Sequence, residues 1–197
     1  MFLVRFPVCS SIYGVDRVEL NLSGLYFRLY DMAYDGRAVA NYVLEFAERE
    51  DRLVTNLSLQ KIVYFCHVWS LIKLKRPLIK HRFEAWQYGP VLQYLYRDFC
   101  GYDNRKIEGF AMQLDKFTGE RTKVPCEFDE ETENLLVKVA DFYSRLSSSQ
   151  LVALSHVEGG PWDQVWNHGG NIKLGMKIED QKIVEFYSSI PTPFTVQ

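Results

Sequence analysis

The sequence predicts a mainly α protein: a single compact helical domain with a small β element, plus an N-terminal extension. Apolar residues recur at helical spacing in several segments, and capping residues precede most of them. One aromatic, extended stretch ends at Gly89-Pro90 and supplies the small β element. We therefore place the extension at residues 1–31, the helical domain at 32–190 and a tail at 191–197.

The composition is that of one folded domain. The chain has 197 residues, 47% apolar and 15% aromatic, which suffices for a core without metals or disulfides and excludes a disordered chain. The net charge of −2 predicts no general affinity for nucleic acid or acidic membranes, and no apolar run approaches a membrane span. The four cysteines follow no ligand pattern, so we expect no cofactor and a reduced, cytoplasmic setting.

The first 31 residues differ from the rest of the chain in their amino-acid composition. They mix single apolar residues with turn formers, and short strands are predicted near 15–20 and 25–29. Their apolar start is short, is broken by Pro7 and has no basic region before it, so we expect no signal peptide. Two interpretations stay open: a start codon placed too far upstream of Met32, or a hairpin packed on the domain edge.

Two helices follow. Asp35 is the predicted N-cap of the first, and Thr55 with Asn56 begins the second, which Pro77 ends. The second helix is apolar on most of its sides, so we expect it to be central and covered all round. Its apolar stripe consists of Leu59, Ile62, Val63, Cys66, Trp69 and Ile72.

The junction at Gly89-Pro90 is the most informative local feature. Residues 78–88 are expected to be extended, with Trp86 and Tyr88 on one face because they are two residues apart. Glycine tolerates unusual backbone angles, and proline suits the first helical position, so a helix is expected to follow directly from Val91. Gly101 would end it.

The second half of the chain alternates between loose and helical segments. Residues 101–128 form turns and two short strands, near 106–110 and 121–125. A helix is then expected to begin at Asp129, because the helix dipole favours acidic residues at an N-terminus. Ser147 and Gln150 have the spacing of a capping box and predict the start of the next helix. The last predicted helix covers 178–188.

Charged residues cluster at two places. Lys73, Lys75, Arg76, Lys80 and Arg82 form a basic cluster, and Glu127, Asp129, Glu130, Glu131 and Glu133 form an acidic one. In the first interpretation, the two clusters are solvent-exposed faces of the protein that face one another. In the second, the basic cluster is a surface that binds an acidic partner.

No catalytic or metal site is predicted. Cys66 and His67 are adjacent, and neighbouring helical residues diverge by roughly 100°, so they cannot act as a nucleophile and its base. A metal or acid–base site is conceivable near the Gly159-Gly160-Pro161 turn, but its spacing fits no zinc pattern and a surface turn is preferred. That group comprises His156, Glu158, Asp163 and His168.

Several blocks of sequence resemble a known domain family. They are Ala38–Leu44, Leu57–Trp69, Pro77–Ile79, Phe83–Val91, Leu151–His156 and Pro161-Trp162. In this order and spacing they resemble the Panacea domain of SocA-like antitoxins and their phage-associated relatives, from about Met32 to Trp166. The Leu-Gln-Lys and Ala-Trp-Gln-Tyr-Gly-Pro-Val blocks are the specific part. Residues 1–31 have no counterpart, and Ser155 stands where threonine is expected.

The resemblance implies a helical antitoxin without enzymatic activity. Antitoxins of this family neutralise unrelated toxic proteins, generally by binding them, and one branch acts as an adaptor that delivers the toxin to a protease. The alternative to direct neutralisation is a phage or mobile-element regulatory protein, or an adaptor that delivers the toxin to a cellular protease. The expected partner is a cognate toxin, with a protease unfoldase as a second partner in the adaptor alternative, and neither membrane nor nucleic acid is expected. The motif residues, structural or partner-binding, are Leu59, Gln60, Lys61, Tyr64, His67, Trp69, Trp86, Tyr88, Gly89, Pro90, His156, Pro161 and Trp162.

Overall fold

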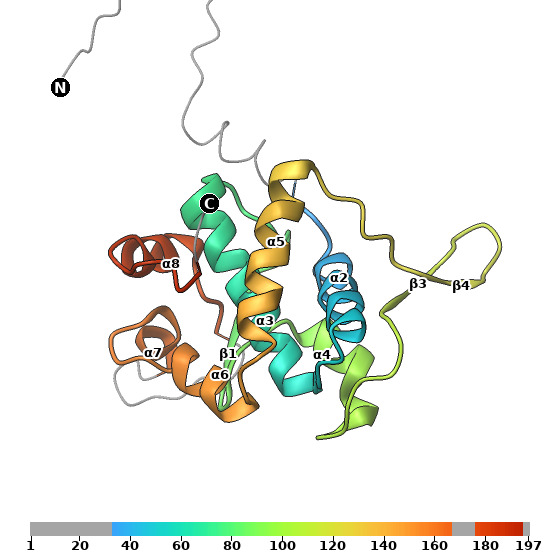
Figure 1. Ribbon diagram of the computed structural model, residues 1–197, viewed down its shortest axis with the longest axis horizontal. Helices are drawn as coiled ribbons and strands as arrows, with labels where there is room; N and C mark the ends of the chain where they lie inside the picture. Colours follow the sequence, from blue (N-terminus) through green and yellow to red (C-terminus); the bar gives the residue numbers. More distant parts are fainter. Residues whose placement is uncertain (1–32, 167–175, 195–197) are drawn as a thin grey trace, which may run out of the picture.

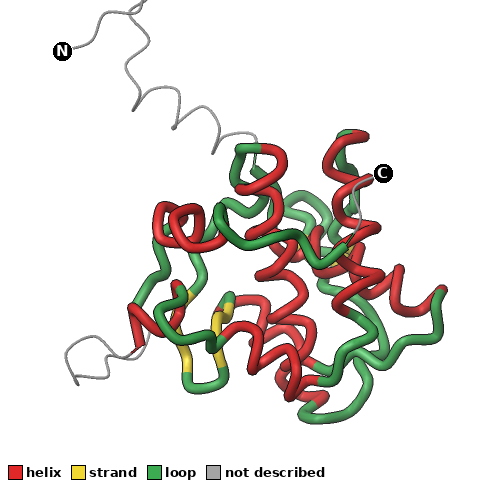
Figure 2. The backbone as a smooth tube through the Cα atoms, turned by 60° about the vertical axis from the view of Figure 1, so that its left-hand side comes forward, coloured by secondary structure: helices red, strands yellow, loops and turns green. Residues whose placement is uncertain are grey.

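The structure, a computed structural model, describes residues 33–166 and 176–194. These residues contain seven α-helices and two short β-hairpins, joined by loops and turns. The helices are α2 (Gly36–Arg49), α3 (Asn56–Trp69), α4 (Gln93–Phe99), α5 (Glu130–Tyr143), α6 (Ser148–Ser155), α7 (Pro161–Trp166) and α8 (Asp180–Tyr187). The hairpins are β1 (Glu84–Trp86) with β2 (Gly89–Val91), and β3 (Met112–Leu114) with β4 (Arg121–Lys123). The predicted fold class is confirmed (Figure 1 and Figure 2), whereas the strands predicted in residues 1–31 lie outside the described residues.

Helix α3 lies at the centre of the molecule, as its apolar surface predicts. All of its residues except Leu57 are buried, and α2, α5, α6 and β2 pack around it (Figure 1). The helix begins with a capping box, in which Thr55 Oγ1 accepts from the Ser58 N–H and Ser58 Oγ accepts from the Thr55 N–H. It continues past Trp69 as a π-helical turn, and Lys75 ends the run in a left-handed conformation.

The segment around Gly89-Pro90 differs from its prediction. Gly89–Val91 is not the start of a helix but the strand β2, which pairs with β1 so that Trp86 lies opposite Gly89. Tyr88 is therefore in the turn and not on the face of a strand that it would share with Trp86. The reason is that a tight hairpin also needs a glycine with positive φ, and Gly89 has a φ of +102°. Helix α4 begins only at Gln93.

Residues 176–178 run beside the outer edge of β1. The Ala85 N–H donates to the Met176 carbonyl and the Ile178 N–H donates to the Phe83 carbonyl, both at 2.8 Å. Glu84 and Lys177 form an antiparallel bridge between them. Strand β1 thus has partners on both edges, one of them from the C-terminal part of the chain.

The second hairpin, β3–β4, projects from the body of the molecule (Figure 1). Its second strand lies within the predicted 121–125, but its first strand is at Met112–Leu114 and not at 106–110. Residues 106–110 instead run along the body, where the Ile107 N–H donates to the Val54 carbonyl. The prediction of the first strand was wrong because that backbone pairs with a loop and not with a strand.

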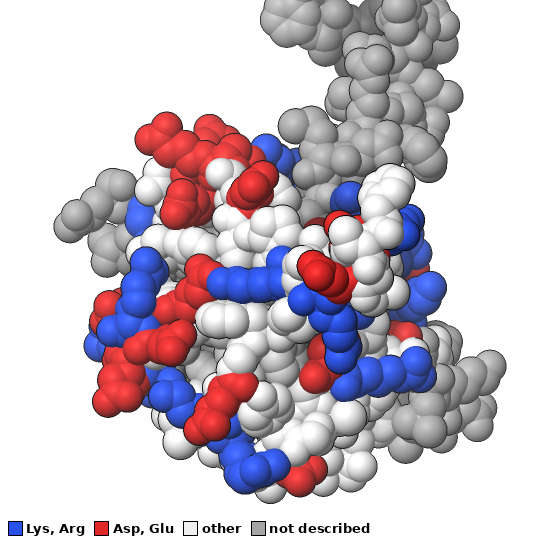
Figure 3. All heavy atoms as spheres, turned by 90° about the vertical axis from the view of Figure 1, so that its right-hand side faces the viewer, with Lys and Arg blue, Asp and Glu red and all other residues white. Residues whose placement is uncertain are grey.

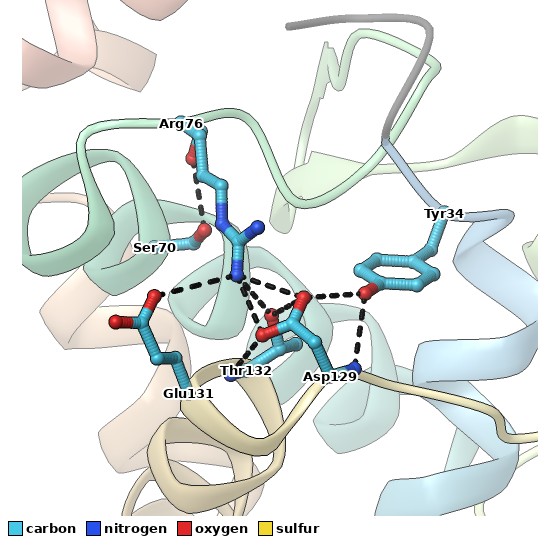
Figure 4. Close-up of polar contacts among 6 residues, drawn as sticks. All are labelled: Tyr34, Ser70, Arg76, Asp129, Glu131 and Thr132. Atoms are coloured by element: carbon cyan, nitrogen blue, oxygen red, sulfur yellow. Dashed lines mark hydrogen bonds and ion pairs between the residues drawn. The ribbon is translucent and has the colours of Figure 1, made fainter.

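The basic and acidic clusters meet through Arg76. Its guanidinium lies 2.7 Å from Asp129 Oδ1 and 3.9 Å from Glu131 Oε2, and donates to Thr132 Oγ1 (Figure 4). Burial acts to raise the pKa of Asp129, but hydrogen bonds from the Thr132 N–H, Tyr34 and Arg76 lower it well below its ordinary value. The prediction that the two clusters face one another is confirmed for Arg76.

On the face that bears β3–β4, charges of both signs are interspersed. Figure 3 shows Lys and Arg side chains next to Asp and Glu over most of this face, with acidic side chains gathered towards the top left. A binding site for nucleic acid would need a continuous basic surface, which this face does not have.

The remaining boundaries follow the predicted signals. Asp35, Asp129 and Ser147 are N-caps whose side chains accept backbone N–H groups, and the capping box of Ser147 with Gln150 is present. The last helix is shorter than predicted and begins at Asp180. No helix within 33–166 and 176–194 combines the length and apolar character that crossing a membrane requires.

Candidate functional site

The β1–β2 hairpin lies where elements from distant parts of the chain meet. Strand β2 packs against α3 and α6, and β1 packs against α7 (Figure 1). The early and late blocks of sequence are therefore brought together around one turn, whose residues are Gln87 and Tyr88.

Two side chains of α3 complete the outer edge of β2. Because Trp86 and Gly89 close a two-residue hairpin, the Pro90 carbonyl and the Leu92 N–H point away from β1. Lys61 Nζ donates to the Pro90 carbonyl at 2.8 Å, and the Leu92 N–H donates to Gln60 Oε1 at 3.0 Å. These side chains take the place of a neighbouring strand. Proline fits at position 90 because it has no N–H that this edge would have to satisfy.

Lys61 is a buried amine without a counterion. It is fully buried, and among the described residues no carboxylate forms an ion pair with it. Burial lowers the pKa of Lys61 to about 7, because a charged amine loses its hydration inside the protein. A buried, perturbed lysine marks either a catalytic group or a structural one, and the bond to the Pro90 carbonyl assigns a structural task to this one.

Gly89 is packed too tightly for any side chain. A Cβ at this position would lie 2.6 Å from Ser155 Oγ and 2.8 Å from Lys61 Cε. The φ of +102° is itself one that residues with a side chain rarely adopt. The glycine therefore allows both α3 and α6 to approach the hairpin.

The C-terminal block closes the hairpin from the side of β1. Trp162 Nε1 donates to the Trp86 carbonyl at 2.8 Å, and the Trp162 ring stacks on His156 with 3.7 Å between centroids. Pro161 is the first residue of α7, a position that favours proline. Burial and the nearby Lys61 lower the pKa of His156, whose Nε2 is buried and has no hydrogen-bond partner within the described part of the chain.

A groove of about 640 Å³ opens between the start of α3, the β1–β2 turn and α4. Three aromatic residues, Trp86, Tyr88 and Tyr96, line it together with Gln60 and Asp103. The side chain of Tyr88 is 60% exposed and that of Tyr96 is 39% exposed. A second hollow, of about 430 Å³, lies between α2 and residues 106–110 and contains none of the motif residues.

Comparison with known proteins decides the family. The model of the family described as "Antitoxin SocA-like, Panacea domain" matches residues 59–163, from the first turn of α3 into α7. The chain belongs to the SocA-like Panacea family. It is 40% identical over 150 residues to a protein of Caulobacter vibrioides named Antitoxin SocA, an alignment that covers 76% of this chain and 80% of the relative. No solved structure matches the chain significantly.

The motif residues of this SocA-like Panacea domain divide into two groups. Around the hairpin lie Gln60, Lys61, Trp86, Tyr88, Gly89, Pro90, His156, Pro161 and Trp162. The others, Leu59, Tyr64, His67 and Trp69, are buried along α3 and belong to the core. The Trp69 indole, for example, donates to the Tyr143 hydroxyl at 2.9 Å.

His67 has a structural environment. Its Nδ1 accepts the Ile79 N–H at 3.2 Å, so Nε2 carries the proton and donates to Asp180 Oδ1 at 3.1 Å. Both ring nitrogens are thereby used to tie α3 to Ile79 and α8. The neighbouring Cys66 is fully buried, and burial raises the pKa of its thiol, which suppresses the reactive thiolate.

The sequence-suggested site near the Gly159-Gly160-Pro161 turn does not assemble in the described residues. Asp163 Oδ2 accepts the Gly159 N–H at 2.9 Å, as a turn residue does. His168 lies outside the described residues. Within 33–166 and 176–194, no group of three or more His, Cys, Asp or Glu side chains could hold a metal ion.

Sequence reasoning missed several residues of the groove. Tyr96 and Asp103 line it but come from segments that carry no motif, and Asn56 directly precedes the motif block Leu57–Trp69. Tyr96 falls within the helix expected from Val91, and nothing in its sequence surroundings indicates that it lines a groove. In the structure its ring lies beside Trp86, with 5.3 Å between ring centroids.

Proposed function

We propose that this protein is the antitoxin of a toxin–antitoxin pair and neutralises a toxic protein by binding it directly. The observation that carries the proposal is the 40% identity to a protein named Antitoxin SocA, over most of both chains. The role belongs to the cytoplasm, where a toxin made in the same cell would be met.

The chemistry of the motif residues supports binding and not catalysis. Lys61, Gln60 and Trp162 use their polar atoms on the backbone of the β1–β2 hairpin. His67 uses both ring nitrogens inside the core. Polar groups that are occupied in this way are not available to a substrate, and a hairpin fixed on several sides suits the display of a rigid surface.

Co-expression with the product of the neighbouring gene tests the proposal. Growth should be arrested by that product alone and restored by this protein, and a complex of the two should elute together from a size-exclusion column. The proposal fails if growth is not restored by any level of this protein.

The same experiment separates direct binding from the adaptor alternative. Direct neutralisation predicts that rescue persists, with an unchanged toxin level, in cells that lack the protease unfoldase. Loss of rescue in those cells, together with a stabilised toxin, would assign the adaptor role instead.

A further inference from the structure

The groove beside the β1–β2 turn carries exposed aromatic rings, of which Trp86 and Tyr96 contact one another. Tyr88 and Tyr96 expose 60% and 39% of their surface, and the Trp86 indole is only partly buried. Large aromatic residues gain much from burial, so several of them around one open groove indicate a surface that a partner covers.

Hydrogen bonds hold the aromatic wall in place before any partner arrives. The Trp86 indole donates to Glu84 Oε2 at 2.9 Å, and the Trp86 carbonyl accepts from the Trp162 indole. The Tyr96 ring lies 5.3 Å from the Trp86 ring. Because these groups are already ordered, a partner loses little entropy in using them.

The charged residue that lines the groove is acidic. Among the described residues that line it, Asp103 is the only acidic or basic one, and the other polar lining groups include the amides of Asn56, Gln60, Gln87 and Asn104. No Lys or Arg of the described part of the chain lines the groove, and Lys61 is buried against the outer edge of β2, where it donates to the Pro90 carbonyl. Asp103 also has a φ of 50° and a ψ of −119°, a conformation that favours glycine and that strains a residue with a side chain.

We propose that this groove binds an arginine or lysine side chain of the toxin. Aromatic faces attract cations, and Asp103 complements the same charge. The alkyl stem of the basic side chain would lie on the apolar groups of Leu57 and Val91, which also line the groove. The identity of the partner as a toxin rests on the proposed function, whereas the preference for a cation rests on the groove alone.

A small probe tests the preference for a cation without any toxin. The probe is a capped five-residue peptide with a central arginine between two valines, and its control has citrulline, the neutral analogue of the same shape. Binding is followed by NMR on the labelled full chain, through the indole N–H of Trp86 and the amides of residues 87–104. We expect millimolar binding of the arginine peptide, about 5-fold tighter than the citrulline peptide. Equal affinities, or shifts that do not map to the groove, would overturn the proposal.

Matched variants test the named residues. Tyr88→Ala and Asp103→Asn should each weaken the arginine peptide by about 5-fold, while Tyr88→Phe, which keeps the ring, should bind as the wild type does. Phe117→Ala removes a still more exposed ring from the distant β3–β4 hairpin and should change nothing. Unchanged melting temperatures show that the variants are folded, since these side chains are exposed.

A last experiment compares how well the wild type and a groove variant neutralise the cognate toxin. If the wild type and a Tyr88→Ala/Asp103→Asn double variant neutralise the toxin equally, the groove is not its binding site and the antitoxin role still stands. If the wild type neutralises nothing, the proposed function fails, and the peptide experiment alone then decides whether the groove binds cations.

Discussion

The two hairpins of this molecule share a secondary structure but differ in their support. β1–β2 is held by side chains from α3 and α7 and by the strand-like residues 176–178. β3–β4 is exposed along nearly its whole length and is attached to α2 by Asn41 at its base and by the ion pair of Lys123 with Glu45. The comparison shows that short hairpins depend on what satisfies their edges, and not on their own pairing, for a fixed position.

The residue at the base of β3–β4 is Asn41. Its amide is fully buried, donates to the Ala111 and Val124 carbonyls and accepts the Ala111 N–H. Beyond this point Lys123 forms an ion pair with Glu45. At the tip, the hydrogen bonds among the described residues stay within the hairpin, for example from the Gly119 N–H to the Asp115 carbonyl. We therefore expect β3–β4 to be held less firmly than β1–β2.

Substitution of the glycines in the two hairpins is expected to give the largest difference in the free energy of unfolding. Gly89 and Gly119 both have positive φ, but a Cβ at Gly119 would have no heavy atom within 4 Å. We expect Gly89→Ala to lower the free energy of unfolding by about 3 kcal/mol or more, from backbone strain and from the clash with α3 and α6. Gly119→Ala should cost about 1 kcal/mol, from strain alone. Urea denaturation measures both, and similar losses would show that packing around Gly89 is not tight.

Removal of Asn41 is expected to have the next largest effect. Asn41→Ala removes three hydrogen bonds: the Ala111 N–H and the Val124 carbonyl lose the Asn41 amide, and the Ala111 carbonyl keeps only the Val124 N–H. This should cost about 2–3 kcal/mol. Hydrogen exchange of residues 111–124 should quicken much more than exchange in β1–β2. If protection falls equally in both hairpins, the base of β3–β4 is coupled to the core and the two hairpins are not supported independently.

Much of this contrast could be read from the sequence, but not all. Caps such as Asp35 and Ser147 were predictable because their side chains bond within their own turn. The central position of α3 was also predictable, because only a surrounded helix is apolar on most sides. These signals are local, and each concerns residues that are near one another in the chain.

The predictions that failed concern segments whose structure depends on residues far away in the sequence. Gly89-Pro90 suits either a helix start or a hairpin, and the choice depends on Lys61 and Gln60, which satisfy the outer edge of β2. The groove was not predictable as a unit, because Tyr96 and Asp103 reach it through the late start of α4 and a strained turn. Their sequence neighbourhoods contain no motif, so only the fold brings them beside Trp86.

Lys61 adds a dependence on pH that β3–β4 should lack. Its pKa falls from 10.5 in the unfolded chain to about 7 in the folded one, so between these values only the unfolded chain binds the proton. Stability therefore rises as the pH increases from about 7 towards 10.5. It is lost as the pH falls back to about 7 and changes little below that, because both states then bind the proton. We expect a gain of about 1 kcal/mol between pH 7 and pH 8 for the wild type.

Lys61→Met should abolish that gain, and Lys116→Met, which removes an exposed lysine between β3 and β4, should preserve it. The measurement is urea unfolding at several values between pH 6.5 and 9.5, where the background from other groups cancels in the difference between variants. Parallel curves for wild type and Lys61→Met would mean that the amine reaches solvent.

The smallest effect is expected at the tip of β3–β4. The Phe117 side chain is 99% exposed, so it contributes no packing to the folded state that serine would lose. Phe117→Ser should change the free energy of unfolding by less than about 0.5 kcal/mol, whereas large substitutions in β1–β2 should cost several times as much. Thermal and urea unfolding of the variant give the value. A loss above about 1 kcal/mol would mean that the ring is packed in solution and that both hairpins are supported by the body of the protein.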